Sequence, residues 1–103
     1  MKKKRIKVLG KEEILEKIKE NREIIKSKGV KKIGLFGSFA KDNQNKKSDV
    51  DIIVEFDKPT LEKYLYVSRL LEKKLKRKID LIIESDLKPE LVYVKKEAQY
   101  VKI

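Results

Sequence analysis

The chain has no cysteine and no histidine. Without cysteine it can form no disulfide, no thiolate nucleophile and no Cys-ligated zinc or iron–sulfur site. Without histidine it has no imidazole general base, no Ser-His-Asp triad and no His-ligated metal. Any metal that binds must therefore be a hard cation held by oxygen ligands, and a carboxylate becomes the natural group to accept a hydroxyl proton.

The chain also lacks a long hydrophobic run. No apolar segment approaches the roughly 20 residues that a membrane-spanning helix requires. The basic start, Met1 to Arg5, resembles the beginning of a signal peptide, but charged residues such as Lys7 and Lys11 interrupt the apolar stretch that should follow. We therefore expect a cytoplasmic, soluble protein without a membrane partner.

Charge is what the sequence has in abundance. Of the 103 residues, 44% are charged and 40% hydrophobic, and the 28 Lys and Arg exceed the 17 Asp and Glu to give a net charge of +11. A basic surface attracts polyanions such as RNA, DNA or nucleoside triphosphates. Most of the lysines, however, alternate with glutamates, as on an ordinary solvated surface. The charge alone therefore does not define a nucleic-acid-binding protein.

The length and the hydrophobic pattern predict one small α/β domain. A chain of this size forms a single compact unit, expected over 1–103, with residues 1–10 as a flexible basic N-terminus. The expected order is α-β-β-α-β-α, a small mixed sheet flanked by helices (an α+β arrangement). Helical periodicity and short apolar or alternating runs predict helices at 11–28, 61–76 and 89–98, and strands at 30–36, 50–56 and 79–83.

Two aspartates lie two residues apart near the start of the predicted strand 50–56. Residues i and i+2 of a strand point to the same face, so we expect Asp49 and Asp51 on one face. Carboxylates this close repel each other; a divalent cation removes the conflict, and Mg²⁺ favours one or two carboxylates together with substrate phosphates. A third carboxylate, Asp80, lies inside an apolar run, where an unpaired charge is costly to bury. A neighbouring strand would bring it to the edge of the same site.

A Gly-Ser pair follows the predicted strand 30–36. Gly37 lets the backbone approach a phosphate closely, and Ser38 offers a hydroxyl and an N–H group. Taken singly, each feature has an ordinary explanation: Gly-Ser is a common turn, Asp-x-Asp is often solvated, and a strand aspartate is often paired. Taken together and in this order, they suit phosphoryl or nucleotidyl transfer, in which positioning and metal electrostatics supply most of the catalysis.

This ordered set resembles the signature of the DNA polymerase β-type nucleotidyltransferase superfamily, which is Gly-Ser, then Asp-x-Asp, then a later Asp. The matching segments are 37–41 (Gly-Ser-Phe-Ala-Lys), 48–56 (Ser-Asp-Val-Asp-Ile-Ile-Val-Glu-Phe) and 78–82 (Lys-Ile-Asp-Leu-Ile). Within that superfamily the chain is most similar to the minimal nucleotidyltransferases, small antitoxin-like proteins encoded beside HEPN-domain partners. The resemblance implies a polymerase β-like nucleotidyltransferase fold.

The resemblance also implies roles for individual residues. Asp49 and Asp51 would bind Mg²⁺, and Asp80 would complete the metal-binding triad and activate the attacking hydroxyl. Gly37 and Ser38 would hold the triphosphate of ATP.

The chain departs from many relatives of this kind at two positions. Phe39 stands where Arg or Tyr is common, and Asp42 stands where glycine is common. Phe39 supplies no charge for a phosphate and is expected at the edge of the pocket. Other residues are therefore candidates for nucleotide binding, the lysines as electrostatic clamps and the serine by ordering the loop: Lys41, Lys46, Lys47 and Ser48.

The function that the resemblance implies is transfer of AMP from ATP to a hydroxyl, expected to be a tyrosine, of a HEPN-domain toxin, with Mg²⁺ and release of pyrophosphate. Two alternatives stay open. The protein is either a nucleotide-binding module that neutralises its partner by contact alone, or a basic RNA-binding protein that acts as an RNA-end nucleotidyltransferase. The nucleic-acid alternative is less favoured, because the three Phe and four Tyr are not arranged as a stacking platform for bases.

An apolar C-terminal stretch has two interpretations. It packs on the sheet as the last helix, or it forms a surface for a partner protein. Its members are Leu91, Val92, Tyr93, Val94, Tyr100 and Val101.

Overall fold

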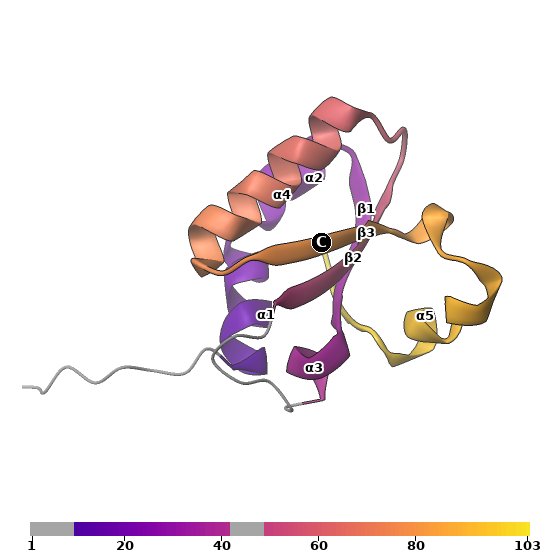
Figure 1. Ribbon diagram of the computed structural model, residues 1–103. Helices are drawn as coiled ribbons and strands as arrows, with labels where there is room; N and C mark the ends of the chain where they lie inside the picture. Colours follow the sequence, from indigo (N-terminus) through magenta and orange to yellow (C-terminus); the bar gives the residue numbers. More distant parts are fainter. Residues whose placement is uncertain (1–9, 42–48) are drawn as a thin grey trace, which may run out of the picture.

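The computed structural model describes residues 10–41 and 49–103 as a four-stranded sheet with helices on both faces (Figure 1). The expected flexible N-terminus falls almost entirely outside these residues. The described elements are α1 (Lys11–Glu20), α2 (Arg22–Ser27), β1 (Val30–Phe36), α3 (Gly37–Ala40), β2 (Val50–Phe56), α4 (Leu61–Leu75), β3 (Ile79–Ile83), the 3-10 helices η1 (Glu84–Asp86) and η2 (Pro89–Leu91), α5 (Tyr93–Glu97) and β4 (Gln99–Val101).

The sheet is mixed, as the sequence predicts. Its strand order is β3-β2-β1-β4, with β1 antiparallel to both β2 and β4 and with β2 parallel to β3. Parallel neighbours need a long crossover connection, and α4 supplies it. The hydroxyl of Thr60 caps the start of α4 by accepting a hydrogen bond from Lys63 N, and the left-handed Lys76 (φ 55°) ends the helix just before β3.

The main core lies between the sheet and the helices α1, α2 and α4, which cover one face (Figure 1). The alternation in β2 places Val50, Ile52, Val54 and Phe56 in this core, while Asp51 and Glu55 remain partly exposed on the other face. Burial of each large aliphatic side chain contributes about 1.5–3 kcal/mol. The core therefore fixes the direction in which the aspartates of β2 point.

The opposite face is held by a mixture of packing and charge. The side chain of Glu84 is 10% exposed, and it pairs with Lys32 of β1 at 3.7 Å and with Lys95 of α5 at 3.5 Å. Tyr100 of β4 packs against Gly34, where any Cβ would lie 2.9 Å from its ring. These contacts join η1, α5 and β4 to the sheet beyond the main core.

Two predicted helices are broken in the structure. The helix predicted over 11–28 is interrupted at Asn21, whose side-chain amide donates a hydrogen bond to Lys17 O at 2.8 Å and competes with the backbone ladder. The last helix, predicted over 89–98, consists of η2 and the shorter α5. The three-residue strand β4 and the single turn α3 were not predicted, because elements this short leave no periodic signal.

One part of the apolar C-terminal stretch is buried and another part is exposed, so each interpretation holds for some of its residues. Val94 and Val101 are buried, as expected for packing on the sheet. Leu91, Val92 and Tyr93 are 39%, 45% and 53% exposed. In the described part of the chain, no helix combines the length and the apolar character needed to cross a membrane.

Candidate active site

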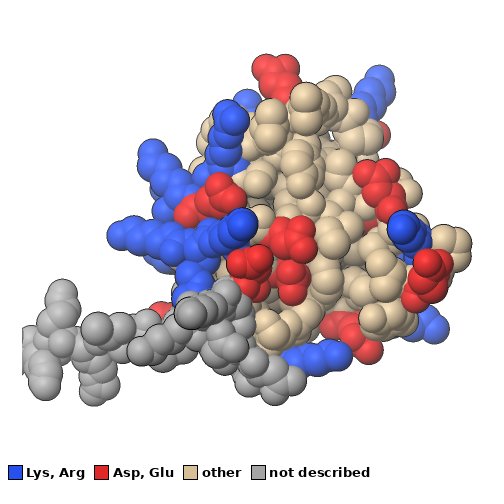
Figure 2. All heavy atoms as spheres, in the orientation of Figure 1, with Lys and Arg blue, Asp and Glu red and all other residues tan. Residues whose placement is uncertain are grey.

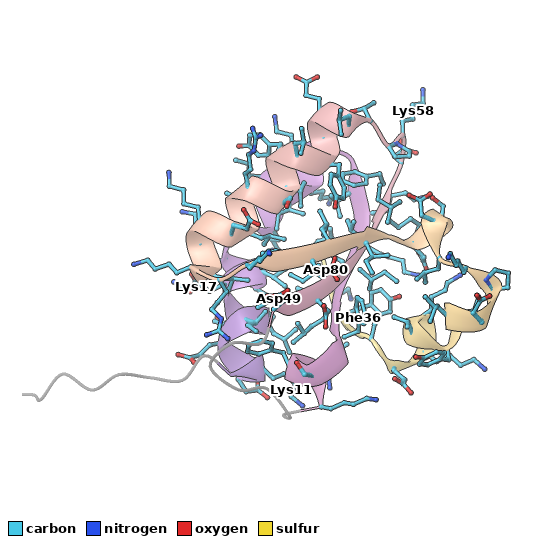
Figure 3. All side chains as sticks on the ribbon, in the orientation of Figure 1. Lys11, Lys17, Phe36, Asp49, Lys58 and Asp80 are labelled. Atoms are coloured by element: carbon cyan, nitrogen blue, oxygen red, sulfur yellow. The ribbon has the colours of Figure 1, made fainter. Side chains whose placement is uncertain are left out.

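The β2–β3 ladder brings the second and third aspartates together. Asp51 and Asp80 are direct partners in the parallel register, so they lie on neighbouring strands about 4.8 Å apart and on the same face of the sheet. Asp80 is exposed and Asp51 is partly buried. Asp49 immediately precedes β2 and lies near Asp80 in Figure 3. The structure therefore gathers all three predicted aspartates from two separate stretches of the chain.

The Gly-Ser bend meets the same site from β1. Phe36, the last residue of β1, is paired with Asp51 across the β1–β2 ladder, so the next residue, Gly37, lies against the Asp51 side chain. Gly37 has φ +76°, a conformation that L side chains rarely adopt, and a Cβ at this position would overlap the Asp51 carboxylate. Ser38 follows in α3 and is partly exposed. Only glycine fits here without displacing the aspartate.

Burial and the neighbouring carboxylates raise the pKa of Asp51. Partial burial, then the charge of Asp80, then that of Asp49 raise the pKa of Asp51 from its usual 3.8 to about 6. Figure 2 shows acidic side chains gathered in the middle of the visible face, with basic side chains beside them. The surroundings of Asp51 therefore oppose the negative charge of its ionised carboxylate.

A hard divalent cation fits this donor set. Carboxylate oxygens are the ligands that Mg²⁺ prefers, and a cation would relieve the repulsion that raises the pKa of Asp51. Among the residues that the structure describes, no three acidic side chains are arranged so that together they could hold a metal ion. An open arrangement suits Mg²⁺, which usually binds to one or two carboxylates and completes its octahedral shell with water and substrate phosphates.

The remaining nucleotide-binding candidates either lie in an exposed ion pair or fall outside the described residues. The Lys41 ammonium lies 3.5 Å from the Glu97 carboxylate of α5, in an exposed pair worth less than about 1 kcal/mol. Phe39 is fully buried, which corrects the expectation that it edges the pocket. Lys46, Lys47 and Ser48 lie outside the described residues.

The sequence analysis assigned no role to the two basic residues that precede β3. The Arg77 guanidinium lies 5.4 Å from the centroid of the Phe39 ring, a cation–π distance, so it covers the residue that replaces the common Arg or Tyr. Lys78 accepts a hydrogen bond from Val50 N at 3.0 Å through its carbonyl oxygen, at the entrance of the β2–β3 ladder. Their position next to Asp80 in the sequence was the available signal.

The structure also contains a cleft away from the aspartates. It has a volume of about 510 Å³ and lies between the start of α4 and the end of β3. Its lining includes Leu61, Tyr64 and Ile83 but none of the three aspartates. The Tyr64 hydroxyl donates a hydrogen bond to Leu81 O at 2.8 Å beside it. This cleft is therefore a separate feature of the surface from the group of aspartates.

Residues 11–101 match the nucleotidyltransferase domain family, and the chain belongs to this family. It is therefore an enzyme of the nucleotidyltransferase type, in the class of the polymerase β-like minimal nucleotidyltransferases. A Methanocaldococcus jannaschii protein whose name places it among the protein adenylyltransferases is 42% identical over 95 residues, which cover 80% of this chain and 95% of that protein. The protein adenylyltransferase MntA of Thermococcus cleftensis is 39% identical over 75 residues, 64% of this chain and 76% of that protein.

Solved structures agree with this assignment. A structure whose description places it among the minimal nucleotidyltransferases has a TM-score of 0.67 and 31% identity, and the match covers 82% of this chain and 92% of that chain. A complex of the Shewanella oneidensis MNT antitoxin with its tri-AMPylated HEPN toxin gives a TM-score of 0.61 at 15% identity, over 84% of this chain and 70% of that chain. At this low identity the second likeness concerns the fold alone.

Proposed function

We propose that this protein transfers AMP from ATP to a hydroxyl of a HEPN-domain toxin, with Mg²⁺ as cofactor, and thereby acts as the antitoxin of the pair. A tyrosine is the proposed acceptor. The observation that carries the proposal is the pairing of Asp51 with Asp80 directly beside the bend at Gly37. The names of the relatives support AMP as the transferred group. The choice of partner is motivated by the fold, which is shared with an MNT antitoxin that binds a HEPN toxin.

Each element at the site supplies one part of this reaction. Asp49 and Asp51 are the proposed Mg²⁺ ligands; bound Mg²⁺ would supply charge stabilisation of the phosphoryl oxygens. Asp80, on the outer strand β3, is the proposed base that accepts the proton of the attacking hydroxyl. The hydroxyl oxygen forms a bond to the α-phosphorus of ATP, and pyrophosphate leaves with the electrons of the broken P–O bond.

The triphosphate is proposed to lie on the β1 side of the aspartates. Gly37 and Ser38 contribute close backbone approach and a hydroxyl there, and Lys41 lies one turn further on. The weak exposed pair between Lys41 and Glu97 leaves the ammonium available to a phosphate at little cost. Lys47 and Ser48, outside the described residues, complete the proposed nucleotide-binding set.

The direct test combines the protein, Mg²⁺, ATP and the HEPN-domain product of the adjacent gene, and weighs the partner by mass spectrometry. The expected result is a gain in mass of one AMP or more, located on a tyrosine by peptide mapping, and its disappearance when the metal is chelated. A partner that forms a complex but keeps its mass would contradict transfer. If that complex still inhibits the toxin, the protein acts by contact alone.

The response to Mg²⁺ should depend on pH through Asp51. Its pKa is higher in the folded protein (about 6) than the usual 3.8, so its ionisation makes the metal-free fold less stable as the pH rises from about 4 to about 6. Mg²⁺ binds the ionised form. We therefore expect added Mg²⁺ to raise the unfolding temperature clearly at about pH 8 and little at about pH 5.

Thermal unfolding with and without Mg²⁺ at both pH values measures this effect. The Asp51→Asn variant is the matched control, because it lacks the titrating group and should lose most of the Mg²⁺ response at both pH values. An equal response of the unchanged protein at both pH values would contradict a role for Asp51 as a metal ligand.

A further inference from the structure

Exposed lysines gather at the junction between α4 and β3. α4 ends at Leu75 and β3 begins at Ile79. We call the exposed lysines of this junction the lysine cluster: Lys73, Lys74, Lys76 and Lys78. Two of them line a hollow together with glutamates of α1, yet none of the ion pairs between described residues involves any member of the cluster. No carboxylate of the described chain therefore neutralises these charges directly.

Only part of the lysine cluster has an ordinary structural explanation. Lys73 and Lys74 lie in the last turn of α4, where a cation interacts favourably with the helix dipole. Lys76 is different, because it has a left-handed backbone (φ 55°) and is the one residue other than glycine that does so in the described chain. Glycine adopts this conformation most readily. The backbone alone favours glycine at this position, so the charge of Lys76 needs another explanation.

One end of the lysine cluster is held beside the aspartates by the sheet. Val50 N–H donates a hydrogen bond to Lys78 O at 3.0 Å, so the ladder that carries Asp80 begins at Lys78. Ile79 is buried, whereas Lys78 and Asp80 on either side of it are exposed and share the face opposite the core. Figure 2 shows basic side chains beside the central acidic group.

The strand order places the lysine cluster on the acceptor side of the site. β2 lies between β1, which ends at the Gly37 bend, and β3, which carries Asp80. With the triphosphate on the β1 side and the proton acceptor on β3, as proposed above, the attacking hydroxyl approaches over β3. The protein that carries this hydroxyl therefore comes to lie next to the lysine cluster.

We propose that the lysine cluster binds an acidic segment of the protein that is modified, next to its acceptor hydroxyl. The argument for this occupant is charge complementarity, since cations without a described partner match a run of Asp and Glu side chains. This inference rests on the proposed function and extends it to the choice of substrate. Among proteins with an accessible tyrosine, the enzyme modifies those with acidic residues beside it in preference.

A single-stranded nucleic acid would also offer negative charge, but the junction lacks the other feature that such a ligand needs. Proteins that bind single strands combine cations with aromatic side chains on which bases stack. In the described chain, Phe39 is fully buried, and the exposed tyrosines are Tyr66, packed against Lys28, and Tyr93 and Tyr100 of the C-terminal segment. None of them belongs to the α4–β3 junction. An acidic polypeptide therefore fits the lysine cluster better than RNA does.

The test measures kcat and KM for AMP transfer to the HEPN-domain partner over a range of salt concentrations. The cluster variant is Lys76→Gly/Lys78→Gln; glycine suits the left-handed backbone, so this variant should not unfold more easily. The charge-matched control is Lys26→Gln/Lys58→Gln. Both control lysines are exposed, one in α2 and the other before the start of α4, a helix about 22 Å long that ends at the cluster (Figure 3).

Loss of two charge-assisted contacts should raise KM for the partner at least about tenfold at low salt, with kcat nearly constant, because the contacts hold substrate and transition state equally. The control should match the unchanged protein. Salt should raise the KM of the unchanged protein more steeply than that of the cluster variant. Polyglutamate should compete with the partner for the unchanged protein and only weakly for the cluster variant.

Equal KM values in the unchanged protein and the cluster variant would overturn the inference, and so would a rise of the same size in the control. Stronger competition by a single-stranded RNA than by polyglutamate of equal charge would also overturn it. If the unchanged protein transfers AMP with a KM that is independent of the cluster, this inference fails while the proposed function stands. If it transfers none, the proposed function itself fails.

Discussion

Asp51→Asn is expected to lower nucleotide transfer about a thousandfold and, at the same time, to make the folded protein more stable. The loss of activity follows because an amide is a poor Mg²⁺ ligand, and metal stabilisation of the transition state is worth several kcal/mol, or about three powers of ten in rate. The measurement is the single-turnover rate of AMP transfer, with Asp86→Asn as a control, since Asp86 is an exposed carboxylate of η1, beyond the end of β3.

The gain in stability has the same physical origin as the raised pKa. At neutral pH the ionised Asp51 is opposed by burial and by Asp80 and Asp49. A pKa rise of about two units corresponds to roughly 3 kcal/mol when fully felt, and solvent screening at this partly exposed position reduces the effect to about 1–2 kcal/mol. Denaturant unfolding at neutral pH without metal measures it. An Asp51→Asn variant that is both inactive and less stable would show that Asp51 supports the fold rather than the chemistry.

Gly37→Ala should lower both the free energy of unfolding and the rate of AMP transfer, and the two effects can be measured separately. The positive φ of Gly37 costs an alanine roughly 1–2 kcal/mol, and the overlap of its Cβ with the Asp51 carboxylate adds a cost of similar size. Because the carboxylate must move, transfer should fall about a hundredfold, as expected for a misplacement of about 1 Å. Unfolding free energies and single-turnover rates measure the two effects.

A double-mutant cycle isolates the overlap from the backbone strain. In an Asp51→Ala background the carboxylate is absent, so Gly37→Ala should cost only the strain of its φ angle. Gly10→Ala is the matched control, since nothing lies within 4 Å of its Cβ position and only a small change in capping is expected. Equal costs of Gly37→Ala in both backgrounds would contradict a steric contact with Asp51.

The sequence predicts on which face of the sheet Asp49 and Asp51 lie, but it does not predict that Asp51 is paired with Asp80. The alternation of β2 already indicates that Asp49 and Asp51 share the face opposite the core. The pairing of Asp51 with Asp80 depends on the register of two parallel strands joined by the fifteen-residue helix α4, and no local pattern encodes that register. The family resemblance therefore supplied what periodicity lacked.

The least predictable residue of the site region was Phe39. The sequence analysis placed it at the edge of the pocket. The single turn α3 instead rotates it into the core, where it is fully buried beneath Arg77. A turn of four residues is too short to show a hydrophobic period, so the direction of a side chain within it cannot be inferred from spacing.

The ion pairs of Glu84 affect how readily the C-terminal segment from η2 to α5 unfolds locally. Only Val94 of α5 is buried, so this helix gains little from the hydrophobic effect, and its described ion pairs join Lys95 to Glu84 of η1 and Glu97 to Lys41 at the end of α3. Pairs of this kind weaken as ionic strength rises. We therefore expect the segment from η2 to α5 to detach at a lower free-energy cost than the helical layer. Its detachment would leave the sheet and its aspartates intact.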